Sequence, residues 1–134
     1  MPDIIRVLVP LDSQEKQTFQ VALSYASAIC KKAKVRDVVL LIYTKGQLDG
    51  SNLGAFLGKA NLKALNAGGV PLEGGLLLTL ATAKTRLMLV RPSVLIVYYA
   101  DDKLLDTADG VRNAAGVVAV PWVPGEADGW AARW

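Results

Sequence analysis

The chain has 134 residues, of which 52% are hydrophobic and 20% are charged, and its formal net charge is +3. This size and composition are typical of one globular domain with its own core and exclude a largely disordered chain. The sequence holds no histidine and a single cysteine, Cys30. An internal disulfide, a cysteine or histidine zinc site and a cysteine nucleophile with a histidine base are therefore excluded. A divalent cation held by carboxylates stays open.

The sequence contains no stretch that resembles a membrane span or a secretory signal. A span needs ~18 uninterrupted apolar residues, and the most apolar region, residues 75–99, is interrupted by Lys84, Arg86, Arg91 and Pro92. The opening residues, Met-Pro-Asp, lack a basic segment followed by an apolar one. We therefore expect a cytoplasmic protein with no membrane partner.

The first part of the chain predicts two buried strands joined by an amphipathic helix. Residues 4–11 and 38–43 are nearly all apolar, as in strands that are buried on both faces. Between them, Asp12 or Ser13 is expected to cap the helix, with Glu15 completing a capping box. Apolar residues with a period of 3.6 mark its buried face: Phe19, Ala22, Leu23, Ala26, Ile29, Cys30 and Ala33. We interpret Cys30 as a buried small side chain rather than a reactive thiol.

The remaining elements follow in alternation. A second helix is expected after Ser51, and residues 70–73 predict a short strand whose proline suits the edge of a sheet. Residues 76–90 predict a third helix that is apolar nearly all round, so a subunit interface is one way to bury its second face. Residues 94–99 and 117–122 predict the last two strands.

This alternation predicts a single three-layer α/β/α domain over residues 1–123, followed by a tail over residues 124–134. The sheet is expected to be five-stranded, mainly parallel and Rossmann-like, with the strand order 3-2-1-4-5 and helices on both faces.

The beginning of the chain resembles a universal stress protein. The matching residues are Leu8-Val9-Pro10-Leu11-Asp12-Ser13, the helix through residues 21–26 and the apolar strand through residues 39–43. The resemblance covers about the first 45 residues by pattern and the remainder by the order of elements. It implies a Rossmann-like fold, a small-molecule or nucleotide-related ligand, and a dimer.

One departure from that family concerns the phosphate site. Nucleotide-binding members carry a glycine motif after the fourth strand, whose backbone amides receive phosphates. This chain has Ala100-Asp101-Asp102-Lys103 there, and Gly110 and Gly116 do not restore the spacing. The resemblance therefore supports the fold more than ATP binding, and we expect weak or absent ATP binding without a divalent metal.

Four residues are candidates for ligand binding: Asp12, Ser13, Asp101 and Asp102. They follow the first and fourth predicted strands, which are neighbours in the expected order, so they should flank the crevice in which ligands of open α/β sheets bind. Their carboxylates could bind Mg²⁺ and, through it, a phosphate. The alternative, which we favour, is that Asp12 and Asp101 cap the helices that follow them. No catalytic residue is assigned.

Two other features suggest anion binding, and each has a simpler explanation. The basic run from Lys31 to Arg36 could contact nucleic acid, but cations at the end of a helix complement its dipole and no aromatic residue interleaves them. The pairs Gly68-Gly69 and Gly74-Gly75 could cradle an anion at the start of the third helix, but such pairs more often mark turns. Nucleic acid is therefore not an expected partner.

The three tryptophans, Trp122, Trp130 and Trp134, are candidate interface residues. Trp130 and Trp134 are four residues apart, so a terminal helix would place them on one face. Large aromatic side chains in a tail imply docking, either onto this domain or onto another subunit. A homo-oligomer, most simply a homodimer, is expected.

Three functions are compatible with these features. The first is a universal-stress-protein-like module that binds a small or nucleotide-related ligand without evident catalysis. The second is a non-catalytic interaction or assembly protein. The third is a Mg²⁺-dependent phosphoryl-transfer enzyme that uses Asp12 with Asp101 or Asp102.

Overall fold

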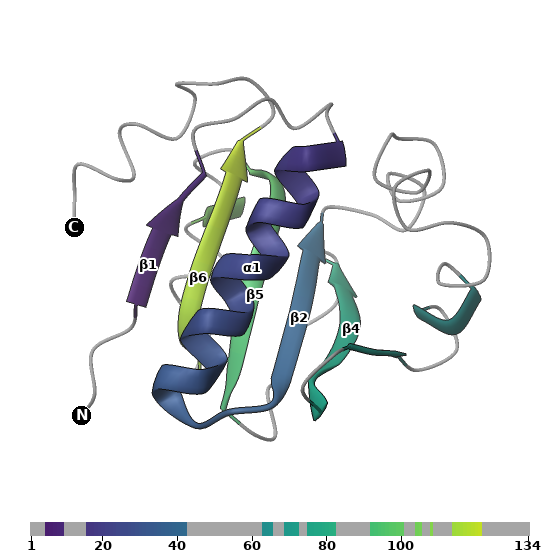
Figure 1. The fold of residues 1–134 in the computed structure, drawn as a ribbon. Coiled ribbons are helices and arrows are strands. Elements are labelled where there is room, and N and C mark those ends of the chain that lie inside the picture. The colour runs from purple at the N-terminus through teal and green to yellow at the C-terminus, as the bar shows by residue number, and fades with distance from the viewer. Residues whose placement is uncertain are drawn as a thin grey trace.

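The computed structural model describes residues 5–9, 16–42, 63–65, 69–72, 75–82, 92–100, 104–105, 108 and 114–121. Within them lies a six-stranded sheet with the order β1-β6-β5-β2-β4-β3 (Figure 1). The strands are β1 (Ile5–Leu8), β2 (Asp37–Ile42), β3 (Val70–Pro71), β4 (Leu77–Thr82), β5 (Ser93–Ala100) and β6 (Ala114–Pro121). All neighbouring pairs are parallel except β3 with β4, which is antiparallel.

The predicted fold class, an α/β domain with a mostly parallel sheet, is confirmed, but the predicted strand order is wrong. The order 3-2-1-4-5 placed the first strand in the centre of five, whereas β1 lies at the edge of six strands, beside β6. The reason is the path of α1 (Lys16–Ala33), which crosses β6 and β5 before the chain enters β2 (Figure 1). The apolar pattern identifies strands, but it does not tell how many of them a connecting helix crosses.

The strands are nearly continuous apolar runs because both faces of the sheet are covered. Successive side chains point to opposite faces, so Leu40, Ile96 and Val118 belong to one core while Leu41, Leu95 and Val117 belong to the other. The first core lies under α1, and the second is closed by the helical residues Leu104, Leu105 and Ala108. Helical segments therefore cover both faces of the sheet.

Helix α1 forms where the sequence predicts it and buries the predicted face. Phe19, Ala22, Ala26, Ile29 and Cys30 are buried in the core, whereas the last member of the stripe, Ala33, is exposed because the helix ends there. The predicted caps at residues 12 and 13 lie outside the described residues.

The two ends of α1 pack on the sheet in different ways. Near its beginning, the ring of Phe19 contacts the ring of Tyr98 edge to face, with 5.8 Å between the ring centroids. Near its end, Ile29 packs against Gly116 of β6, where a Cβ atom would stand 2.8 Å from Cγ2 of Ile29. Gly116 therefore belongs to the packing of α1 on the sheet.

The predicted third helix over residues 76–90 is wrong in its first half, because residues 77–82 form β4 between β2 and β3. Leu78 is buried in the core under α1, Leu76 and Leu80 pack against the same core, and Ala81 packs against the opposite one. The apolar character on all sides is thus explained by a strand with two covered faces. Residues 83–90, and the predicted second helix except for residues 63–65, lie outside the described residues.

Candidate functional site

The predicted ligand-binding residues all follow strands that end at one side of the sheet. The parallel strands β1, β2, β4, β5 and β6 share this carboxyl end, which is uppermost in Figure 1. Asp12 and Ser13 follow β1 in the sequence, and Asp101 and Asp102 directly follow β5. These four residues, together with Trp122, Trp130 and Trp134, lie outside the described residues.

The observed strand order changes which candidates follow neighbouring strands. The expected order made the first and fourth predicted strands neighbours, so Asp12 and Asp101 were expected to flank one crevice. In the structure β6 lies between β1 and β5, and two strand spacings amount to about 10 Å. The premise that Asp12 and Asp101 follow neighbouring strands is therefore wrong, whereas metal binding by these carboxylates stays a prediction.

The same order draws attention to the carboxyl ends of two other neighbouring strands, β2 and β5. After β2 the chain passes Leu65, which is buried in the core under α1, and reaches β3 and β4 on one side. After β5 it passes Leu104 and Leu105, buried in the opposite core, and reaches β6 on the other side. Two neighbouring parallel strands thus send the chain to opposite faces, which defines a topological switch point. In open α/β sheets ligands bind in the crevice at such a point.

A second candidate lies at the opposite, amino end of the sheet. There a hollow of about 440 Å³ opens where β2, β4 and β5 begin. Charged and apolar residues line it together: Lys34, Arg36 and Asp37, with Val35, Leu77 and Pro92. We call it the amino-end hollow. A backbone hydrogen bond from the Leu77 N–H to the Arg36 carbonyl, 2.9 Å long, joins two of its walls.

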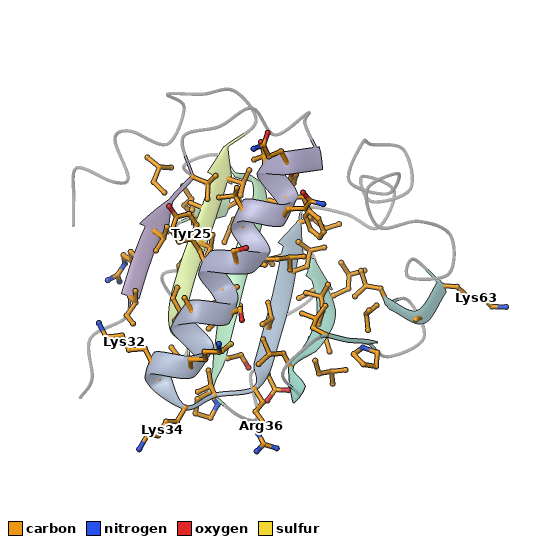
Figure 2. All side chains as sticks on the ribbon, in the orientation of Figure 1. Tyr25, Lys32, Lys34, Arg36 and Lys63 are labelled. Carbon is orange, nitrogen blue, oxygen red and sulfur yellow. The ribbon has the colours of Figure 1, made fainter. Side chains whose placement is uncertain are left out.

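Two basic residues, Lys34 and Arg36, line the amino-end hollow, and two others lie at the same end of the chain's first helix. Lys31 and Lys32 occupy the last turn of α1, as predicted for cations that complement the helix dipole. Lys34 and Arg36 follow the helix, and all four side chains are exposed. Figure 2 shows Lys32, Lys34 and Arg36 projecting from this end of the molecule, whereas Lys63 lies apart from them. The sequence placed this run at the end of a helix but gave no sign of a hollow beside it.

Lys34 has an unusual backbone conformation. Its φ is +58°, a left-handed value that costs about 1–2 kcal/mol for a residue with a Cβ atom. The Val35 N–H donates a 3.0 Å hydrogen bond to the Cys30 carbonyl, so α1 ends in a Schellman motif with Lys34 at the position that glycine usually occupies. Sequence reasoning missed this feature, because lysine is not a signal for a left-handed residue.

Gly69 and Gly75 are the described members of the two glycine pairs, for which turns are the favoured interpretation and an anion cradle the alternative. Gly69 and Gly75 have positive φ values of +148° and +79°, which glycine adopts without a steric penalty. A Cβ atom at Gly69 would stand 3.1 Å from the Leu78 carbonyl oxygen. Because residues 77–82 are a strand, no helix begins at residue 76 to receive an anion, and the anion-cradle alternative loses its basis.

Cys30 is buried, as predicted. It is 1% exposed, and burial, followed by the negative charge of Asp37, raises the pKa of its thiol. A raised pKa keeps the sulfur protonated at neutral pH, and the thiolate is the nucleophilic form. Cys30 is therefore a packing residue.

Three further findings concern the site as a whole. Among the described helices none is long and apolar enough to cross a membrane. Within the same residues no three histidine, cysteine or carboxylate side chains gather into a possible metal site. A scan against family models, a search of curated proteins and a search of solved structures found no match to this chain.

Proposed function

We propose that this chain is a small-ligand-binding protein whose ligand, nucleotide-related in class, enters the crevice between the carboxyl ends of β2 and β5. The observation that carries this proposal is the switch point, where the connections of these two neighbouring strands leave for opposite faces of the sheet. In its more specific form, the proposal is that the chain is a universal-stress-protein-like binding module. Because the resemblance covers about 45 residues by pattern and no family model matches the chain, the switch point supports the proposal more strongly than the resemblance does.

Asp101 and Asp102 supply the chemistry of the proposed crevice. They are the first two residues after β5, one of the two strands at the switch point. Carboxylates accept hydrogen bonds from the hydroxyl groups of a sugar or the amino groups of a base. They repel phosphates unless a divalent cation intervenes, and carboxylates are ligands that Mg²⁺ prefers. We therefore expect a nucleotide to bind with Mg²⁺ and only weakly without it.

Thermal unfolding tests this proposal with ATP and AMP as probes, each with and without magnesium chloride. A ligand at one hundred times its dissociation constant stabilises the native state by about 2.7 kcal/mol. We expect ATP with Mg²⁺ to raise the midpoint of the intact chain and to leave that of the double variant Asp101→Asn, Asp102→Asn unchanged. The double variant Glu126→Gln, Asp128→Asn alters the same number of charges in the tail and should respond like the intact chain.

Asp12→Asn separates this crevice from the three-carboxylate alternative. Asp12 follows β1, and β6 separates β1 from β5, so the stabilisation by ATP and Mg²⁺ should survive this substitution. An equal loss in Asp12→Asn and in the Asp101, Asp102 double variant would favour a shared metal and phosphoryl transfer instead. If neither nucleotide raises the midpoint under any condition, nucleotide-related binding is wrong.

The interaction and assembly alternative has lost one of its supports. The apolar region at residues 76–82 is accounted for by β4 and its flanking residue within one subunit. The expected homodimer and the role of Trp122, Trp130 and Trp134 remain predictions that concern the tail.

A further inference from the structure

We propose that the amino-end hollow is a second binding site, which takes a phosphorylated small molecule with an apolar body. It lies at the opposite end of the sheet from the crevice between β2 and β5, so it does not depend on the function proposed above. Three observations on described residues support it: the charge around the hollow, its shape and lining, and the backbone of Lys34.

The charge around the hollow favours an anion. Lys34 and Arg36 line it, and Lys31 and Lys32 are exposed on the last turn of α1, just before Lys34 in the chain. The carboxylate among the lining residues, Asp37, is half-buried and has an interaction of its own within the chain. Two cations and one carboxylate thus line the hollow, and two further cations precede Lys34 in the chain. Lysine and arginine side chains both recognise phosphate, arginine through two parallel hydrogen bonds.

The lining and size of the hollow favour a small molecule with an apolar part. Val35, Leu77 and Pro92 give it apolar walls, and its volume of about 440 Å³ falls in the range of small-molecule sites, roughly 300–1,000 Å³. At Gly75, which also lines it, a Cβ atom would meet no atom within 4 Å. The hollow therefore has room for a ring beside the cations.

The backbone of Lys34 suggests that its side chain has a use. Glycine would satisfy the left-handed position at the end of α1 without strain, yet a lysine stands there with φ +58° and lines the hollow. Strained residues gather at functional sites, where the surrounding structure holds them in place. The two backbone hydrogen bonds beside it, Val35 N–H to the Cys30 carbonyl and Leu77 N–H to the Arg36 carbonyl, hold this segment.

A nucleic acid strand is the main competing partner for a basic surface. It would engage all four cations over a longer path, and proteins that bind single strands stack bases on aromatic side chains. The lining of the hollow contains no aromatic residue among the positions that the structure describes. A small phosphorylated molecule therefore fits the described lining better.

A titration followed by amide chemical shifts tests the site with phenyl phosphate, inorganic pyrophosphate and phenol. We expect phenyl phosphate to shift the amides of residues 34–37 and 75–77, with pyrophosphate weaker and phenol without effect. Lys34→Gly should weaken the binding of phenyl phosphate at least tenfold, which is the smallest loss expected when a hydrogen bond to a charged group is removed. The same substitution should raise the unfolding midpoint, because glycine relieves the strain, so lost binding cannot be attributed to lost folding. Arg36→Gln should also weaken binding about tenfold.

The matched control is Lys63→Gln, which removes one positive charge at a site apart from the hollow (Figure 2). It should leave the affinity for phenyl phosphate unchanged. Equal losses in Lys63→Gln and Lys34→Gly would mean a general effect of net charge and would overturn the site, as would shifts confined to residues near the carboxyl end. An oligothymidylate is the probe for nucleic acid. If it bound more tightly than phenyl phosphate, and if Lys31→Gln and Lys32→Gln weakened it as much as Lys34→Gly does, the surface would be assigned to nucleic acid and the proposed ligand would be wrong.

Discussion

The two ends of α1 show two ways to join a helix to a parallel sheet. Near the carboxyl end of the sheet, two aromatic rings, Phe19 and Tyr98, fill the space between the layers. Near the amino end, Gly116 leaves room for Ile29 to approach the backbone of β6. The aromatic contact fills volume, whereas the glycine contact removes a side chain. A smaller side chain should therefore be harmful at the first contact, and a larger one at the second.

Phe19→Ala is expected to have the largest effect on stability. Phe19 is 5% exposed and contacts Tyr98, which is fully buried. Removal of a buried phenylalanine ring usually lowers the free energy of unfolding by about 3–5 kcal/mol, because apolar burial is lost and a cavity remains. Urea unfolding followed by circular dichroism measures this loss. Phe19→Leu retains much of the volume and should lose clearly less. A loss below about 1 kcal/mol for the alanine variant would show that the site collapses around the gap.

Gly116→Ala tests the opposite end and should lower the free energy of unfolding by about 1–3 kcal/mol. The added methyl group would stand 2.8 Å from Cγ2 of Ile29 and 3.2 Å from the carbonyl oxygen of Ile5. Ile29→Ala removes the first of these clashes, so the double variant should lose less than the sum of the two single losses. Strict additivity would mean that the backbone contact with Ile5 dominates.

The sequence predicts correctly those strands and helices whose apolar pattern fits a single periodicity and stops at a recognisable residue. The predicted strands at residues 38–43, 94–99 and 117–122 match β2, β5 and β6 within a few residues, and the buried stripe of α1 was identified from Phe19 to Cys30. The region after residue 76 was misassigned because a strand buried on both faces has no alternation, so its leucines match a helix equally well. The position of β1 at the edge depends on long-range pairing with β6, which local patterns do not record.

Of the two candidate sites, the sequence indicates the one at the carboxyl ends of the strands and not the amino-end hollow. Asp101 and Asp102 are proposed because charged residues after an apolar strand stand out, and they remain predictions. The amino-end hollow was missed because Lys34 and Pro92 meet only after β2, β4 and β5 pair. The left-handed Lys34 gives no signal, since neither its type nor its neighbours differ from an ordinary helix end.

Lys34→Gly, unlike the two core variants, is expected to raise the free energy of unfolding, by about 1 kcal/mol. The positive φ of Lys34 is strained for lysine and ordinary for glycine. Lys34→Ala keeps a Cβ atom and should give no such gain. Lys32→Gly, inside the last turn of α1, should instead lower stability by up to about 1 kcal/mol, because glycine weakens a helix interior. Urea unfolding of the three variants would contradict the left-handed conformation if Lys34→Gly were no more stable than Lys34→Ala.

The smallest expected effect concerns Cys30 and appears only at alkaline pH. Burial and the charge of Asp37 raise the pKa of this thiol in the folded chain, so the native state holds the proton more tightly than the unfolded state does. The contribution to stability is complete below the unfolded pKa of about 8.5 and is lost as the pH rises toward the folded pKa. At about pH 9 the loss stays below about 1 kcal/mol. Tyrosines and lysines also titrate in alkaline solution, so the comparison is with Cys30→Ala, whose unfolding free energy should fall less steeply over the same range. Parallel slopes for the two proteins would mean that the thiol has the same pKa in both states, and the end of α1 nearest Asp37 would then be better hydrated than its burial indicates.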